Sequence, residues 1–444
     1  MWRLLIPGLK LKRFMALMAL GFMALGMALG LSLWALPALI PHWHRPASEA
    51  VLLVLGVGSI VLGVYGLWRS LNEMLGSDKW AGLLYSKRQL ARGPHVAALG
   101  GGTGMPSVLR GLKHYSSNLT AVVTVADDGG SSGRLRGDMG MLPPGDIRNC
   151  MVALADTEPL MEQLFQHRFT SGELKGHSFG NLFLAAMEQV SGDFVTALRE
   201  SSRVLAVRGT VLPATLEHVT LEAELVDGTH VTGESAIGHS ARPISRVWME
   251  PGDATPLREA IESIMSANMV VLGPGSLYTS ILPNLLIPAI ADAIRQTPAV
   301  RVYVANIMTQ PGETVNFSVR DHLDAIESHV GPGLIDVVLV NNQRVPEHLL
   351  ARYRQEGADQ VGVIFNGGGT GGEPVVIYDN LLLAGQVVRH DPDKLAVALL
   401  RILLKFRPKW AEGRMIDAAW LENRLRERHQ PRWDGLMRDK LRRR

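Results

Sequence analysis

The sequence predicts an α/β protein with a Rossmann-like, doubly wound, mostly parallel sheet, preceded by two transmembrane helices. From residue 95 onward, short apolar runs rich in β-branched residues alternate with helical stretches, and one region alternates in polarity instead. Two long uncharged segments precede these runs. Continuous apolar runs are typical of strands buried on both faces of a parallel sheet. Their alternation with helices is typical of doubly wound folds.

Residues 1–70 are predicted to form a transmembrane helical hairpin. The spans, at about 14–40 and 50–68, carry no charge, and a spanning helix needs about 20 apolar residues. The first run is longer than the apolar core of a signal peptide; a cleaved signal and buried soluble helices are the alternatives. Basic residues flank the hairpin on both outer sides, whereas the loop 41–49 holds one Arg and one Glu. The positive-inside rule therefore predicts a multi-pass cell-membrane protein with both termini and the main domain in the cytoplasm.

A juxtamembrane connector is expected at 71–93, followed by the main domain at 94–405. Its predicted parallel strands are 95–99, 121–126, 269–273, 301–308 and 335–342. Residues 203–250 alternate in polarity and contain Asp227-Gly228, a favoured hairpin turn. This pattern predicts an antiparallel β insertion at 203–250. The basic, helical tail 406–444 is either solvated or in contact with anionic lipid.

The composition excludes several classes of protein. With 444 residues, of which 47% are hydrophobic and 20% charged, the chain is not mainly disordered. Its one cysteine, Cys150, excludes an internal disulfide and a cysteine zinc cage. A net charge of +3 does not indicate a nucleic-acid partner. The sequence has no HExxH motif, no His/Cys metal spacing and no Gly-x-Ser-x-Gly elbow on these strands. We therefore expect no zinc, haem or flavin.

The glycine loop 100–104 directly follows the first predicted strand and precedes a helix. Converging N–H groups and a helix N-terminus favour an anion there, so we assign Gly101, Gly102, Thr103 and Gly104 to phosphate. The loop is neither a strict GxGxxG nor a Walker motif. A tight turn without ligand is the alternative. The GPGSLY segment 273–278 follows a later strand in the same way, which adds Gly275 and Ser276 as a second phosphate contact.

Asp127 and Asp128 follow the second predicted strand. Such an acid can bind a ribose hydroxyl, and the two together can hold Mg²⁺, the one cofactor that these residues allow. If the chain is an enzyme, they are the catalytic candidates. An Asx turn in a Gly/Ser loop is the alternative. Arg134, nearby in GGSSGRLR, is assigned to phosphate because guanidinium groups bind phosphate in bidentate fashion.

The motifs PPGDIRN (143–149) and GHSFGN (176–181) each lead into a helix. We assign Asp146, Asn149, His177 and Asn181, together with Asp127, to a sugar or substrate. Two alternatives without a ligand remain: Asp146 caps its helix, and Ser178 caps the other. All of these motifs follow strands or open helices, and open α/β sheets bind ligands at the carboxyl ends of their strands.

In these residues the chain resembles a known family. GGGTGM (100–105), TVADDGGSSGRLR (124–136), PPGDIRN, GHSFGNLF (176–183), TLEHVTLEAEL (215–225), GPGSLYTSILPNLL (273–286) and NIMTQPGET (306–314) resemble the YvcK-type gluconeogenesis factors. These belong to the superfamily of 2-phospho-L-lactate transferase (CofD-like). The resemblance covers roughly residues 94–405. It implies a Rossmann-like fold, a UDP-sugar ligand such as UDP-N-acetylglucosamine, and a role in carbon metabolism, cell shape and cell-wall synthesis.

Three functions follow from this resemblance and from the motifs. The first is a nucleotide-sugar-binding regulator tethered to the inner face of the membrane. The second is a Mg²⁺-dependent transferase of the 2-phospho-L-lactate type, although GGSSGRLR and GHSFGNLF depart from that branch. The third, suggested by the glycine loop alone, is an NAD-dependent oxidoreductase. The sequence leaves open whether the ligand is turned over and whether the chain forms a homodimer.

Overall fold

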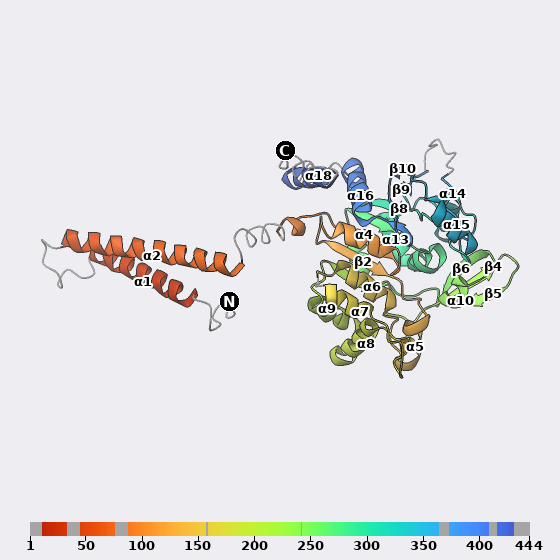
Figure 1. The fold of residues 1–444 in the computed structure, drawn as a ribbon, viewed down its shortest axis with the longest axis horizontal. Coiled ribbons are helices and arrows are strands. Elements are labelled where there is room, and N and C mark those ends of the chain that lie inside the picture. The colour runs from red at the N-terminus through yellow and green to blue at the C-terminus, as the bar shows by residue number, and fades with distance from the viewer. Residues whose placement is uncertain are drawn as a thin grey trace, which may run out of the picture. The chain divides into compact units, whose positions relative to one another are not determined.

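The computed structural model describes residues 11–32, 45–75, 88–156, 159–240, 242–363, 373–407 and 415–429. The chain divides into two compact units, Met1–Arg88 and Gln89–Arg444. Most of the connector, the loop 41–44 and the tail beyond residue 429 lie outside the described residues. Figure 1 shows the elements of each unit.

The first unit consists of α1 (Leu11–Ser32) and α2 (Arg45–Leu75), which pack closely. A Cβ added at Gly21 would lie 2.7 Å from Ile60 Cγ1, and one at Gly56 would lie 2.8 Å from Leu25 Cγ. Small residues allow this kind of close approach between helices in membranes. Outward-facing side chains such as Phe22 and Val54 are large, apolar and exposed.

One of these two helices has the length and composition to cross a membrane. The segment Ala50–Arg69 of α2 has 20 residues with a mean hydropathy of 2.4. The apolar part of α1, Phe14–Leu29, is shorter, and residues 33–40 of the predicted first span lie outside the described residues. A second span and the orientation of the chain therefore stay predictions.

The second unit is built on a seven-stranded sheet in the order β10-β9-β8-β7-β1-β2-β3. Its strands are β1 (Val96–Gly100), β2 (Leu119–Val123), β3 (Thr210–Pro213), β7 (Met269–Leu272), β8 (Val300–Val304), β9 (Val337–Asn341) and β10 (Val375–Asp379). All of its neighbouring strands pair in parallel. The predicted doubly wound α/β fold is thereby confirmed.

The helices between these strands pack on the two faces of the sheet. They are α4 (Met105–Leu112), α5 (Gly130–Met139), α6 (Gly145–Leu154), α7 (Pro159–Gln166), α8 (Phe179–Ser191), α9 (Phe194–Val204), α11 (Arg258–Met265), the π-helix η2 (Leu277–Ile281), α12 (Leu282–Leu285), α13 (Pro288–Gln296), α14 (Val319–Val330) and α15 (Glu347–Gln355). A hairpin of β11 (Leu382–Ala384) and β12 (Val388–His390), then α16 (Pro392–Phe406) and α18 (Met415–His429), complete the unit.

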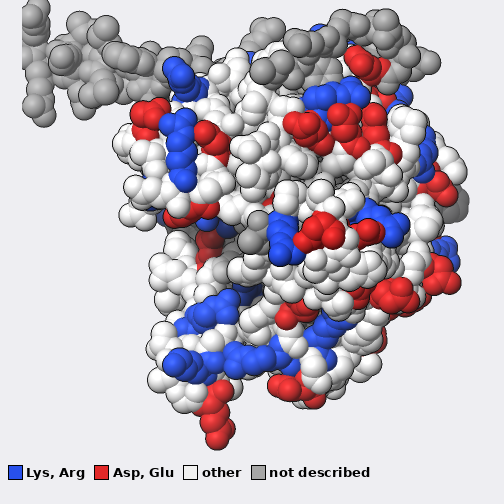
Figure 2. All heavy atoms as spheres, turned by 90° about the vertical axis from the view of Figure 1, so that its right-hand side faces the viewer, with Lys and Arg blue, Asp and Glu red and all other residues white. Residues whose placement is uncertain are grey.

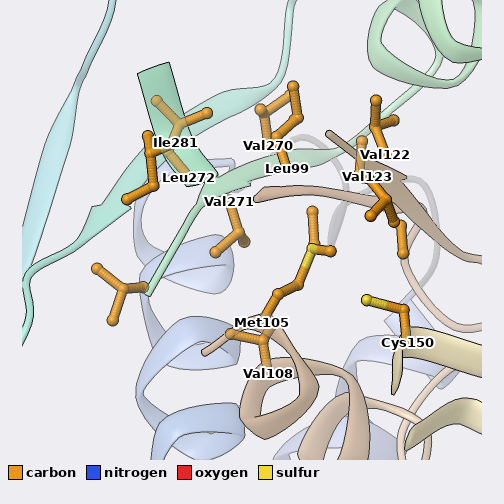
Figure 3. Packing of buried hydrophobic residues seen from close by; sticks show 14 of the residues in the cluster. Leu99, Met105, Val108, Val122, Val123, Cys150, Val270, Val271, Leu272 and Ile281 are labelled. Atoms are coloured by element: carbon orange, nitrogen blue, oxygen red, sulfur yellow. The ribbon is translucent and has the colours of Figure 1, made fainter. Parts of the chain in front are cut away.

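The core lies on either side of the central strands. Every residue of β1, β7 and β9 is buried, as expected for strands that are covered on both faces. Figure 3 shows Met105, Val108 and Cys150 on one side of these strands and Ile281 on the other. Cys150 is fully buried there as a small apolar residue.

The predicted β insertion is smaller than 203–250. Its antiparallel sheet has the order β5-β4-β6, formed by β4 (Thr220–Leu225), β5 (His230–Thr232) and β6 (Ile244–Glu250), with the short helix α10 (Glu234–Gly238) between β5 and β6. Asp227-Gly228 makes the β4–β5 turn as expected. The segment 210–213, however, is β3 and pairs in parallel with β2. Four residues are too few for polarity to distinguish an edge strand of one sheet from a strand of another.

Candidate functional site

The sheet has one point at which its strand order reverses, between β1 and β7. From β1 the chain proceeds to β2 and β3 on one side, and from β7 it proceeds to β8, β9 and β10 on the other. The loops 101–104 and 273–276 therefore leave the sheet side by side. Open α/β sheets bind ligands in the crevice at such a switch point.

A pocket of about 230 Å³ lies at this switch point. The glycine loop, the β7 loop, the β8 loop and the β11–β12 hairpin each contribute to its wall. The lining residues are Thr103, Gly104, Ser107, Pro274, Gly275, Ser276, Asn306, Ile307, Met308, Gln310, Val387, Val388, Arg389 and His390. Four of the predicted phosphate contacts thus meet in one pocket. Residues 387–390 belong to no motif that sequence reasoning identified.

The glycine loop is tightly enclosed on its other side. A Cβ at Gly102 would lie 2.6 Å from Asp146 Cα, and one at Gly104 would lie 2.1 Å from the backbone oxygen of Pro274. Backbone atoms cannot move aside as a flexible side chain can, so both positions require glycine. Thr103 is the exposed residue of the loop and lines the pocket.

Three carboxyl groups, which we call the acidic group, influence one another electrostatically: Asp127, Asp146 and Glu234. Asp146 lies against the glycine loop. Asp146 accepts a hydrogen bond from the Gly102 N–H and is not the N-cap of α6, which is Pro144. Burial and then Asp127 raise the pKa of Asp146 to about 7. Burial, Asp127 and Asp146 raise the pKa of Glu234 to about 8. These shifts mean that the three groups do not all ionise readily near neutral pH.

Arg148 is the cation that faces Asp127 and Asp146. It is buried in α6, with Nη1 bonded to Ser178 Oγ and Nη2 donating to Asn149 Oδ1 at 2.8 Å. Asn149 is thus engaged with this guanidinium. The sequence analysis assigned no role to Arg148. Its charge within the otherwise apolar segment after PPGD could have indicated one.

His177 and Asn181 meet at the N-terminal turn of α5. His177 Nδ1 and Asn181 Nδ2 each lie 3.1 Å from Ser131 Oγ. Burial, followed by Arg134, lowers the pKa of His177, which keeps its imidazole neutral near pH 7. Ser178 caps α8 by accepting the Asn181 N–H at 3.2 Å, as the structural alternative expected. Arg134 donates to the Lys175 carbonyl at 3.0 Å and holds the adjacent loop.

The β7 loop is tied to the β8 loop by side chains. Asn306 accepts the Gly275 N–H at 3.1 Å and donates to the Gly275 carbonyl at 2.8 Å. Gln310 donates to Ser276 Oγ at 2.8 Å. The buried Glu313 accepts the Tyr278 N–H at 3.1 Å and the Thr279 hydroxyl at 2.9 Å. The carboxylate of Glu313 therefore occupies the N-terminus of η2. The Gly275 N–H is already bonded to Asn306.

Comparison with known proteins places this architecture in a family. The family model described as 2-phospho-L-lactate transferase CofD matches residues 96–372. The gluconeogenesis factor of Bacillus subtilis is 49% identical over 311 residues, covering 70% of this chain and 98% of the relative. The chain belongs to the CofD family, among the gluconeogenesis factors. The resemblance seen in the motifs is thereby confirmed.

Two further relatives extend the comparison. A crystal structure of a protein from Bacillus halodurans, 48% identical, matches with a TM-score of 0.66 over 69% of this chain and 99% of that one. A relative from Clostridium acetobutylicum is 44% identical over 434 residues, covering 95% of this chain and 96% of the relative. The alignment with the Clostridium relative therefore extends well beyond the region that the Bacillus proteins share.

In this CofD-family chain the neighbouring residues Asp127 and Asp128 contact different elements. Asp127 Oδ1 accepts the Gly129 N–H at 2.9 Å, which is an Asx turn, and its second oxygen faces the start of α6. Asp128 Oδ1 accepts the Ser235 N–H at 2.9 Å and so contacts the β insertion. β2 ends at Val123, so the three residues 124–126 separate the strand from Asp127. Our prediction that the strand runs to 126 is wrong.

Over the described ranges, no three His, Cys, Asp or Glu side chains are arranged to hold a metal ion by themselves. Mg²⁺ commonly uses one or two carboxylates and completes its shell with water and substrate phosphate. Asp127 and Asp146 fit that smaller requirement, because Asp127 is near enough to raise the pKa of Asp146, and Asp146 lies against the glycine loop.

Proposed function

We propose that this chain binds a UDP-sugar, such as UDP-N-acetylglucosamine, at the switch point and acts as a regulator of carbon metabolism, cell shape and cell-wall synthesis. The observation that carries the proposal is the pocket at the switch point, into which four loops converge. Thr103 and Ser276 offer hydroxyls to a diphosphate, and Arg389, exposed in the pocket wall, offers a cation. Ile307 and Met308 offer apolar contact to a base.

The membrane tether is a second part of the proposal. The apolar segment 50–69 supports it by its length and composition. In this arrangement α1 and α2 form a hairpin, both termini are cytoplasmic, and the pocket faces the compartment that holds nucleotide sugars. Mg²⁺ would be held by Asp127 and Asp146, where it would offset the negative charge of the acidic group.

A transferase of the 2-phospho-L-lactate type is the second candidate. The acidic group favours it, because carboxyls with pKa values raised to about 7 and about 8 can exchange a proton near neutral pH. Incubation of the full chain with UDP-N-acetylglucosamine, Mg²⁺ and candidate acceptors separates the two functions. A product means an enzyme, whereas saturable binding without product means a regulator.

Calorimetry on the full-length chain in detergent tests the ligand. UDP-N-acetylglucosamine should bind more tightly than NAD. Thr103→Val removes a hydroxyl that can bond a charged phosphate, a loss of about 1.5–3 kcal/mol, and should weaken binding about ten- to a hundredfold. Arg389→Ala should weaken it at least as much. Arg199→Ala, in a separate pocket beside β3, is the matched control and should bind normally. Equal or tighter NAD binding would reverse the assignment.

A further inference from the structure

Asp128 lies against the β insertion and away from its neighbour Asp127. Its Oδ1 accepts the Ser235 N–H at 2.9 Å, and a Cβ at Gly233 would lie 2.2 Å from its Oδ2. A Cβ at Gly145, in contrast, would lie 3.0 Å from Asp127 Oδ2. One acid therefore faces α6 and the other faces α10.

The contact at Ser235 holds the residue next to Glu234. Glu234 starts α10. A Cβ at Gly129 would lie 2.6 Å from Ser235 Oγ and 3.4 Å from Asp127 Oδ1, so the start of α10 lies close to Asp127. No hydrogen bond or ion pair holds the Glu234 side chain itself within the part of the chain that the structure describes. Its position therefore depends on how the backbone at 233–235 is fastened.

We propose that Asp128 is a positioning residue that fastens the β insertion to the loop after β2 and thereby holds Glu234 against Asp127 and Asp146. Glu234 then belongs to the site although it comes from a different sheet. Asp128 acts through the backbone of α10 and not as a metal ligand. The fastening itself is independent of the ligand, and only the binding readout below rests on the proposed function.

Two other contacts keep the insertion docked when Asp128 is changed. A Cβ at Gly312 would lie 2.6 Å from the Gly238 carbonyl oxygen, so the β8 loop packs directly on the end of α10. His329 Nε2, on α14, accepts the Val247 N–H of β6 at 3.0 Å. Loss of the Asp128 contact should therefore loosen α10 locally while β4–β6 stay in place.

Hydrogen–deuterium exchange on the full-length chain, without ligand, tests the fastening. In Asp128→Ala the amides of 233–238 should exchange about tenfold faster or more, as expected when one bond to a charged acceptor is lost. Asp128→Asn keeps an acceptor oxygen and should restore most of the protection. Asp253→Ala, at an exposed turn of the same region, is the control. Unchanged exchange in Asp128→Ala would overturn the proposal.

Binding of UDP-N-acetylglucosamine tests the consequence for the site. Asp128→Ala should weaken it, whereas Asp128→Asn, which keeps an acceptor oxygen, should bind as the wild type does. If Asp128 held Mg²⁺ instead, Asp128→Asn would lose Mg²⁺-dependent binding as fully as Asp128→Ala, and the proposal would be wrong. If the wild type binds no UDP-sugar, the proposed function fails, while the exchange experiment still decides the fastening.

Discussion

At the scale of single residues, burial of like charges makes the acidic group sensitive to pH. The pKa of Glu234 rises from 4.5 to about 8 on folding. An acid with a raised pKa binds more protons when folded, so its contribution to stability is lost as pH rises from about 4.5 to about 8. Glu234→Gln removes this loss. The difference in melting temperature between variant and wild type should therefore grow from pH 5 to pH 8 and then level off.

Thermal unfolding in a series of buffers without divalent cations measures this difference. Glu173→Gln, at an exposed loop position, is the control and should show no such trend. A constant difference between Glu234→Gln and wild type across the range would mean that Glu234 is solvated and ionised in the folded chain.

At the scale of elements, the β7 and β8 loops behave as one piece because Glu313 joins them. Both of its oxygens accept hydrogen bonds, from the Tyr278 N–H and the Thr279 hydroxyl. Glu313→Gln replaces one acceptor with a donor and leaves a buried donor unpaired, which costs about 1–3 kcal/mol. We expect chemical denaturation to show a loss of this size, together with weaker UDP-sugar binding, because Ser276 lies on the loop that is released.

The control for that experiment makes the same Glu→Gln change at an exposed acid, because Glu313 is a buried one. Burial raises its pKa, whereas hydrogen bonds from the Thr279 side chain and from the Tyr278 and Thr279 backbone favour the ionised form. Glu173→Gln again serves as the exposed comparison. Full stability of Glu313→Gln would show that the two loops keep their contact through Asn306 and Gln310 alone.

At the scale of the whole molecule, the open question is how the chain meets the membrane. The basic flanks of the apolar segments predict that residues 41–49 are outside and both termini inside. A cysteine introduced at Ser48 should react with an impermeant thiol reagent in intact cells, and one at Ser86 should not. The native Cys150 is buried and gives little background. Labelling at 86 but not at 48 would reverse the orientation.

Side chains of both charges occur on the visible face of the main unit. Figure 2 shows Lys and Arg interspersed with Asp and Glu over much of this face, and a row of basic side chains across its lower left. This distribution matches a net charge of only +3 on 444 residues. A net charge this small gives little long-range attraction for an anionic ligand, so nearby cations such as Arg389 in the pocket wall matter more.

Much of the fold could be predicted because its signals are local in the chain. The runs 95–99 and 269–273 are apolar throughout, and a strand with both faces covered has that composition wherever it lies. Gly101–Gly104 and Gly275-Ser276 follow such strands directly, so their place at the carboxyl edge follows from the strand itself. The sequence alone determined the family, the parallel sheet and the two loops at the switch point.

Tertiary structure alone decided which side chains meet. Asp127 and Asp128 are adjacent in sequence, yet they turn to α6 and α10, while Glu234 joins Asp146 from 88 positions along the chain. Residues 387–390 of the β11–β12 hairpin line the pocket, and this contact also depends on tertiary packing. Residue type and spacing report local backbone conformation. The approach of distant carboxylates, and of the cation Arg148 to Asp127 and Asp146, depends on how the sheets and helices pack.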